Sequence, residues 1–145
     1  MDKHAILISV RPKFAEMIFS GGKTVELRRV CPKISVGDLA LVYVSSPAKE
    51  LQGAFEVGKI ISASPLALWR KVGGKSGMNR RDFLAYFQGK TKAHALMIKR
   101  AWKLPAPICL TTLRRRKGGF RPPQNFHYLR RNESSLFTSA ILQTN

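Results

Sequence analysis

Carboxylates are scarce in this chain of 145 residues, which has eight Asp and Glu against twenty-six Lys and Arg. The formal net charge is +18, and the stretch from Phe83 to Asn132 contains no Asp or Glu at all. So few acids leave little room for paired catalytic carboxylates and disfavour cationic substrates. Self-repulsion of this size favours a polyanionic partner, although a merely soluble basic surface would have the same composition.

The positive charge is also distributed unevenly along the chain. Residues 1–82 carry fourteen Lys and Arg against seven carboxylates, whereas residues 83–145 carry twelve against Glu133 alone. Charge that is segregated in this way focuses an electrostatic field, which scattered charge does not. We therefore expect the C-terminal half to present one continuous positive face to its partner.

Cysteine and histidine are too few and too scattered for a metal site or a disulfide framework. The two cysteines, Cys31 and Cys109, are too few for a four-ligand zinc site, and His4, His94 and His127 have no metal-type spacing. We therefore expect no metal and no cofactor. No run of eighteen apolar residues occurs either, which argues against a membrane span. Together these absences predict a cytoplasmic protein without a membrane partner.

Short apolar runs alternate with Pro, Gly and charged residues, as in a fold of short strands and helices. Strands are expected over 5–10, 24–29, 39–44, 53–61 and 93–102. Helices are expected over 12–21, 65–71, 81–87 and 110–116. Five or six strands with helices inserted between them favour an α+β fold, a small and mostly antiparallel β-barrel.

Two common catalytic motifs are absent. Residues 73–76, GGKS, place Lys and Ser after glycines, but Trp69 stands where a phosphate-binding loop needs its first glycine. We expect a flexible loop there and no nucleotide hydrolysis. No G-x-S-x-G nucleophile elbow occurs, although a Ser-His-Asp arrangement elsewhere stays open.

Glu26 is the carboxylate whose surroundings point to a site. It lies between Lys23 and Arg28, and side chains at 24, 26 and 28 share the polar face of the predicted strand. One interpretation is a structural ion pair. The other is a polar cluster at the mouth of the barrel, in which Glu26 accepts from a base amino group and a cation contacts phosphate or carbonyl oxygen.

An ordered set of motifs surrounds Glu26. Residues 21–28, GGKTVELR, contain the pattern G-x-K-x-x-E-x-R. The further members are VGD at 36–38, YVSSP at 43–47, GAFEVG at 53–58 and FRPPQNF at 120–126. This set resembles the ASCH domain, a branch of the PUA-like superfamily, and in particular its small members described as predicted transcriptional regulators. The resemblance covers about residues 4–130 and leaves 131–145 as a C-terminal tail.

The resemblance implies a PUA-like pseudobarrel, with a cleft between the barrel and its inserted helices. Family members are thought to bind RNA or modified nucleotides, and some cleave RNA or deacetylate N4-acetylcytidine. The deacetylating branch uses a motif lysine, a threonine three residues later and a glutamate beyond the barrel strands. Lys23 matches the lysine, but Glu26 stands in the threonine's place and residues 72–79 hold no carboxylate. Thr24 would have to substitute from a different face of the strand.

Residues of three kinds are predicted to form the site. Arg and Lys after Leu113 are expected to contact phosphates, and Phe126 or Tyr128 to stack a base, although both aromatics fit core positions equally well. The ligand-binding set is Lys23, Glu26, Arg28, Ser45, Ser46, Gln124, Phe126 and Tyr128. The set that contacts the nucleic-acid backbone is Arg114, Arg115, Arg116, Lys117 and Arg121.

The sequence thus predicts a nucleic-acid-binding domain with a basic cleft, with RNA favoured over DNA and binding favoured over catalysis. One alternative is an RNA-directed hydrolase, either a ribonuclease or an N4-acetylcytidine amidohydrolase, with Lys23, Thr24 and Glu26 as catalytic candidates. Another is a DNA-facing regulator that acts through partners. The recognised base and the oligomeric state stay open.

Overall fold

Strands and helices alternate along the chain in the computed structural model, which describes residues 4–130, 133, 137 and 138. The elements in chain order are β1 (Ala5–Val10), α1 (Pro12–Ser20), β2 (Val25–Arg28), β3 (Leu39–Val44), β4 (Glu50–Ala63), α2 (Pro65–Val72), a 3-10 turn (Gly73–Lys75), α3 (Arg80–Tyr86), β5 (Ala93–Cys109), α4 (Leu110–Arg116) and β6 (Phe126–Tyr128).

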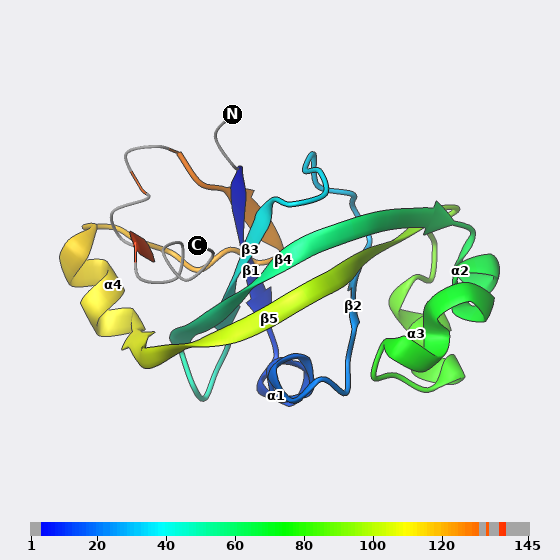
Figure 1. The fold of residues 1–145 in the computed structure, drawn as a ribbon, viewed down its shortest axis with the longest axis horizontal. Helices are drawn as coiled ribbons and strands as arrows, with labels where there is room; N and C mark the ends of the chain where they lie inside the picture. The colour runs from blue at the N-terminus through cyan, green and yellow to red at the C-terminus, as the bar shows by residue number, and fades with distance from the viewer. Residues whose placement is uncertain (1–3, 131–132, 134–136, 139–145) are drawn as a thin grey trace.

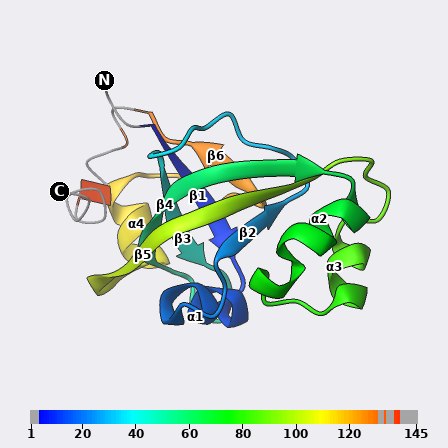
Figure 2. The same cartoon turned by 45° about the vertical axis from the view of Figure 1, so that its right-hand side comes forward.

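The strands form one curled sheet, a half-barrel with the order β2-β5-β4-β3-β1-β6. Only β1 and β3, among the strands of the described residues, pair in parallel; every other pair is antiparallel. The long strands β4 and β5 run side by side across the molecule, with α4 at one end and α2 and α3 at the other (Figures 1 and 2). The expected α+β fold of mostly antiparallel strands with inserted helices is confirmed.

Helix α1 packs on the sheet at a point where the sequence allows a close approach. Pro12 begins the helix, and Gly21 ends it in the left-handed conformation with φ 88°. At Gly53 on β4, a Cβ atom would clash first with the backbone carbonyl oxygen of Trp102 on β5 and would also lie 2.8 Å from the ring of Phe19. Glycine at this position therefore allows both the close approach of β4 to β5 and the packing of Phe19 on the sheet.

The pair α2 and α3 closes the other end of the half-barrel with its own apolar cluster. Ser64 and Asn79 cap the two helices, since their side chains accept from Ala67 N and Asp82 N. Phe83 is fully buried and meets the ring of Trp69 edge-on, with 5.2 Å between centroids. Capping and packing together fix α3 beside β2.

Helix α4 and the C-terminal residues share a further cluster. Leu113 and Phe120 pack there with Leu7, Leu51 and Phe137. Phe137 is fully buried, so at least this residue of the predicted tail 131–145 has a partner in the core that the sequence did not indicate. Most of that tail lies outside the described residues.

Predicted and observed elements differ mainly at strand ends. Strand β5 continues past Trp102 to Cys109, although it contains Pro105 and Pro107. Prolines are tolerated there because the pairing between β4 and β5 shifts register between Leu51 and Gly53. Strand β2 begins only at Val25, so the expected start at Thr24 is wrong.

Candidate functional site

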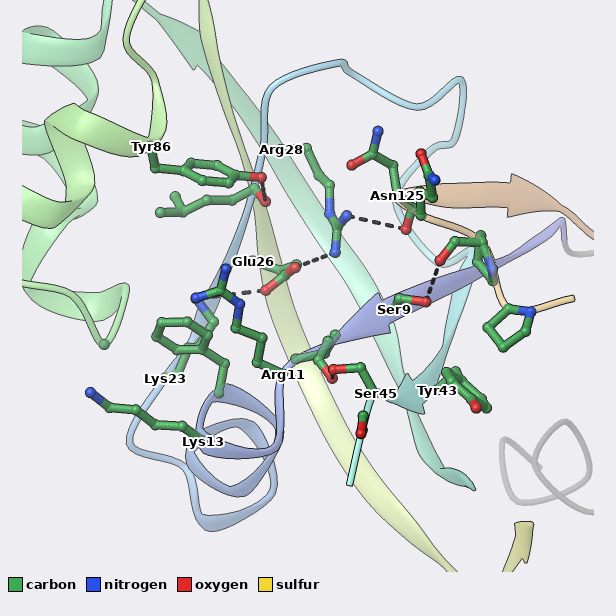
Figure 3. Close-up of a pocket in the computed structure, with 18 of the residues that line it drawn as sticks. Ser9, Arg11, Lys13, Lys23, Glu26, Arg28, Tyr43, Ser45, Tyr86 and Asn125 are labelled. Carbon is green, nitrogen blue, oxygen red and sulfur yellow. Dashed lines mark hydrogen bonds and ion pairs between the residues drawn. The ribbon is translucent and has the colours of Figure 1, made fainter. Parts of the chain in front are cut away.

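A cleft of about 1200 Å³ opens between the half-barrel and its helices. Its walls come from the end of β1, α1, β2, α3, the start of α4 and the segment 122–125 (Figure 3). Its lining is strongly basic. Six cations line it, namely Arg11, Lys13, Lys23, Arg28, Lys49 and Arg114, against the two carboxylates Glu26 and Asp82.

Local geometry brings the three charged motif residues to the floor of this cleft. After α1 ends, Lys23 N donates to Met17 O at 3.0 Å, which turns the chain back toward the sheet. Strand β2 then pairs with β5, with Glu26 opposite Leu96 and Arg28 opposite His94. Glu26 and Arg28 share one side of β2 because strand side chains alternate.

The charged groups on the floor are nearly closed to solvent and paired with one another. Lys23, Glu26 and Arg28 are 3%, 6% and 6% exposed. Arg28 Nη2 donates to Glu26 Oε2 at 2.5 Å, and Lys23 Nζ lies 3.6 Å from Glu26 Oε1 (Figure 3). Glu26 therefore forms the ion pair of the first interpretation and also lines the cleft, while its role as an acceptor for a base amino group stays a prediction.

Arg28 retains unused hydrogen-bonding capacity. Its Nη1 donates to the carbonyl of Asn125 at 3.3 Å, but its buried Nε has no hydrogen-bond partner. An unpartnered buried donor costs free energy unless a ligand or water satisfies it. Arg28 thus ties β2 to the segment 122–125 and leaves one donor unsatisfied beside the cleft.

Lys23 has an environment that disfavours its charged form. Its Nζ donates to the carbonyl of Ser76 at 2.7 Å and lies 5.2 Å from the centre of the Phe14 ring. Burial lowers the pKa of Lys23, which the carboxylate of Glu26 opposes and the guanidinium of Arg28 reinforces. A lysine with a lowered pKa in a cleft can act as a proton acceptor or a nucleophile.

Hydroxyl groups line the same cleft. Ser9 Oγ donates to Pro123 O at 2.5 Å, and Tyr86 OH donates to Leu27 O at 3.3 Å. Burial raises the pKa of the Tyr43 phenol, and the positive charge of Arg114 opposes this shift. Both tyrosines therefore stay protonated at neutral pH and can donate hydrogen bonds.

The structure brings most, but not all, of the predicted site residues together. The predicted residues that line the cleft are Lys23, Glu26, Arg28, Ser45, Ser46, Gln124 and Arg114. Arg115, Arg116, Lys117 and Arg121 do not line it. Lys117 Nζ instead pairs with Glu133 Oε2 at 2.5 Å.

Three further predicted residues lie away from the cleft. Thr24 is exposed outside it, with its backbone held by Lys75 O and Ile98 N. Phe126 borders a separate small pocket, and the hydroxyl of Tyr128 accepts from Lys33 N at 2.7 Å. Thr24 therefore does not line the cleft together with the other two catalytic candidates, Lys23 and Glu26.

The sequence analysis did not identify several of the residues that line the cleft. Arg11 and Lys13 flank the proline that begins α1, and Tyr43 belongs to the YVSSP motif, so local signals for these three existed. Ser9 and Tyr86 had no such signal, because only the pairing of β1 with the segment 122–125 and the packing of α3 on β2 bring them to the cleft.

No group of three or more His, Cys, Asp and Glu side chains in the described ranges is placed to hold a metal ion. No helix in the part of the chain that the structure describes is both long and apolar enough to cross a membrane.

Known proteins are similar to this chain both in sequence and in architecture. Residues 8–105 match the model of the ASCH domain family. An ASCH domain-containing ribonuclease from Zymomonas mobilis is 30% identical over 142 residues, which cover 98% of this chain and 95% of that protein. The crystal structure of ASCH from Zymomonas mobilis superposes with a TM-score of 0.88 at 30% identity, over 95% of this chain and 96% of that one. This likeness confirms the expected PUA-like fold.

A second relative is similar over only part of its length. The large ribosomal subunit protein uL22 of Ureaplasma parvum is 35% identical over 126 residues, which are 86% of this chain and 39% of that protein. This chain therefore spans well under half of that relative.

Proposed function

The chain belongs to the ASCH domain family, and we propose that it binds single-stranded RNA in the cleft above Lys23, Glu26 and Arg28. The observation that carries this proposal is the charge of the cleft, where six cations face two carboxylates. A concave basic site concentrates a polyanion and tracks its phosphates. The similar ribonuclease of Zymomonas mobilis, which matches along nearly its whole length, supports RNA as the polyanion.

The floor and the walls of the cleft would bind different parts of the ligand. The exposed cations Arg11, Lys13 and Arg114 are suited to phosphates. Glu26 is an acceptor for a base amino group, and Arg28 has a spare donor. Aromatic side chains along the lining offer faces on which an unpaired base can stack. An unpaired strand exposes these base edges, whereas a duplex does not.

Binding is tested by titrating labelled single-stranded RNA, DNA of the same sequence and duplex RNA at increasing salt. We expect single-stranded RNA to bind most tightly, and log K to fall with log salt by about 0.7 per phosphate contact. The double variant Arg11→Ala with Lys13→Ala should lower that slope by about 1.4. A control with two exposed cations removed from α2, Arg70→Ala with Lys71→Ala, should change the slope less. Equal slopes for both variants would contradict binding in the cleft.

We also infer that the bound RNA is cleaved, which changes the preference drawn from the sequence alone. The specific observation is the buried amine of Lys23, whose pKa burial lowers. In its neutral form Nζ accepts the proton of a ribose 2′-hydroxyl while that oxygen attacks the adjacent phosphorus. The bond from phosphorus to the 5′ oxygen breaks, water protonates the leaving oxygen, and a 2′,3′-cyclic phosphate remains. Arg28 would stabilise the charge on the phosphoryl oxygens.

Cleavage is tested with labelled RNA that carries a single 2′-deoxy nucleotide. We expect a cyclic phosphate product from normal RNA, no cut at the deoxy position, and loss of product in Lys23→Gln, which keeps a donor toward Ser76 O. N4-acetylcytidine should stay intact, because Glu26 stands in the place of the threonine and Thr24 lies outside the cleft. Retention of RNA without any product would leave binding as the function.

A further inference from the structure

A second, smaller pocket of about 250 Å³ lies beside the cleft. It is lined by Arg28, Arg29, Val30, Lys90, Asn125 and Phe126. Arg28 and Asn125 line the cleft as well. The two hollows therefore meet at the hydrogen bond from Arg28 Nη1 to the carbonyl of Asn125.

The small pocket is purely cationic in its charged groups. Arg28, Arg29 and Lys90 line it, and no carboxylate does so among the residues that the structure describes. The one carboxylate in contact with these cations, Glu26, belongs to Arg28 and lies on the cleft side. Three positive charges around so small a volume repel one another unless an anion enters.

Backbone contacts hold the two outer cations in position from separate segments. Arg29 Nη2 donates to Gln88 O at 3.2 Å, so its guanidinium is anchored against the turn after α3. In that turn Lys90 N donates to Phe87 O at 2.9 Å, and Gly89 has φ 84°. The turn brings Lys90 to the same pocket as Arg29, and both residues are exposed.

An apolar surface completes the pocket. Phe126 is half-buried and meets the ring of Tyr128 edge-on at 5.7 Å between centroids, while Val30 is 54% exposed. Cations on one side and apolar groups on the other fit a phosphate followed by its sugar. Val30 is a large apolar side chain that no packing in the described structure covers well, and a ribose would shield it.

We propose that this pocket is a phosphate subsite for the nucleotide next to the one in the cleft, with Arg29 and Lys90 as the phosphate-binding residues. The strand would pass over the bond between Arg28 and Asn125, which joins the two hollows. The proposal rests on RNA binding in the cleft. It makes the preferred ligand an oligonucleotide of at least two nucleotides with a phosphate at one particular end.

The test uses 2′-O-methyl dinucleotides, which cannot be cleaved by 2′-hydroxyl attack. Three forms are titrated: one without a terminal phosphate, one with a 5′ phosphate and one with a 3′ phosphate. In the natural sequence, one of the two phosphates should tighten binding about tenfold, as expected for charge-assisted hydrogen bonds. Arg29→Ala with Lys90→Ala should lose this gain while binding the unphosphorylated dinucleotide as before. The α2 control, Arg70→Ala with Lys71→Ala, should retain the gain.

The outcomes separate the subsite from the function on which it rests. If the dinucleotides bind but neither phosphate adds affinity, or if the α2 control loses the gain as well, the subsite is wrong and RNA binding stands. If inorganic phosphate competes for the gain as strongly as the phosphorylated dinucleotide itself, the pocket is a free anion site, and the subsite is also wrong. If no RNA of any length binds at about 50 mM salt, both proposals fail.

Discussion

The basic residues on the floor of the cleft and those on helix α4 are of the same types, but they differ in burial and in pairing. Lys23 and Arg28 are almost completely buried and are tied to Glu26. Arg114, Arg115 and the rest of the basic run on α4 are exposed. Buried charges are strongly coupled to their partners, whereas exposed charges are screened by water and salt. The two groups should therefore act differently, the buried cations through fixed ion pairs and exposed cations such as Arg114 through contacts that salt weakens.

The difference also explains why net charge alone was a poor guide to the site. The sequence placed the larger excess of cations after residue 82, but the cleft draws on both halves, with Arg11 and Arg114 at its rim. On α4 only Arg114 lines the cleft, and Lys117 is neutralised by Glu133. Of the predicted backbone-contacting run Arg114 to Lys117, only Arg114 lines the cleft, and whether the others contact a nucleic-acid backbone stays a prediction.

The largest expected effect is the loss of stability in Glu26→Ala. It would leave Arg28 and Lys23 without their carboxylate in a site closed to water, at a cost of about 3–5 kcal/mol of unfolding free energy. Glu56→Ala is the matched control, because Glu56 also pairs with two cations, but Lys99 and Arg100 are 62% and 46% exposed. The ion pairs of Glu56 with these two cations should contribute less than about 1 kcal/mol to the free energy of unfolding.

Urea denaturation of both variants measures this difference. Similar losses for Glu26→Ala and Glu56→Ala would mean that burial does not distinguish the floor of the cleft from an ordinary surface pair.

A second large effect is expected at the α4 end of the molecule. Phe137→Ala should remove about 3 kcal/mol, because it opens a cavity among Leu113, Phe120 and their neighbours. Leu66→Ala, at an exposed position on α2, should stay within about 1 kcal/mol. Thermal or urea unfolding measures both. An unchanged midpoint for Phe137→Ala would contradict its place in the folded core.

The next largest expected effect is the change in the rate of RNA cleavage as Lys23 loses its proton. Because burial lowers the pKa of Lys23, the neutral amine becomes populated at lower pH than in an ordinary lysine. Below that pKa the rate should rise about tenfold per pH unit, since each unit multiplies the neutral fraction by ten. It should level off below pH 10.5, the ordinary lysine value.

Single-turnover rates at saturating protein measure the profile. A rate that falls as pH rises through this range would mean that the charged amine is required instead, as a phosphate-binding group.

The smallest effect contrasts two cations of α4. Arg114→Ala should lower the salt slope of RNA binding by about 0.7, one phosphate contact, because Arg114 lines the cleft. Lys117→Ala should leave the slope nearly unchanged, because its ammonium pairs with Glu133. Fluorescence titrations at several salt concentrations resolve the two. A greater loss in Lys117→Ala would return the binding surface to the exposed basic run.

Local patterns predicted the elements whose limits are set by local signals. The apolar run LALVYV became β3 with the expected limits, and Pro12 and Gly21 bounded α1 as expected. The motif residues Lys23, Glu26 and Arg28 do converge on one cleft, since Glu26 and Arg28 lie on the same side of β2. Whether they bind the ligand as proposed stays a prediction.

What the sequence did not predict depends on contacts between distant segments. Strand β6 has only three residues, and its partner β1 lies more than a hundred residues earlier. The sequence indicated no partner for Phe137, because its neighbours in the cluster are far away in sequence. Tyr86 reaches the cleft only because α3 packs on β2. No periodicity within one segment carries that information.

Photocrosslinking tests most directly whether RNA occupies the cleft. Single-stranded RNA containing 4-thiouridine, with 2′-O-methyl groups to prevent cleavage, is bound at low salt, irradiated and mapped by mass spectrometry of the crosslinked peptides. Crosslinks should fall on cleft-lining aromatics such as Phe14 and Tyr86, and Arg11→Ala with Lys13→Ala should reduce them. Crosslinks confined to α4 beyond Arg114, or to the outer face of β4 and β5, would contradict RNA binding in the cleft.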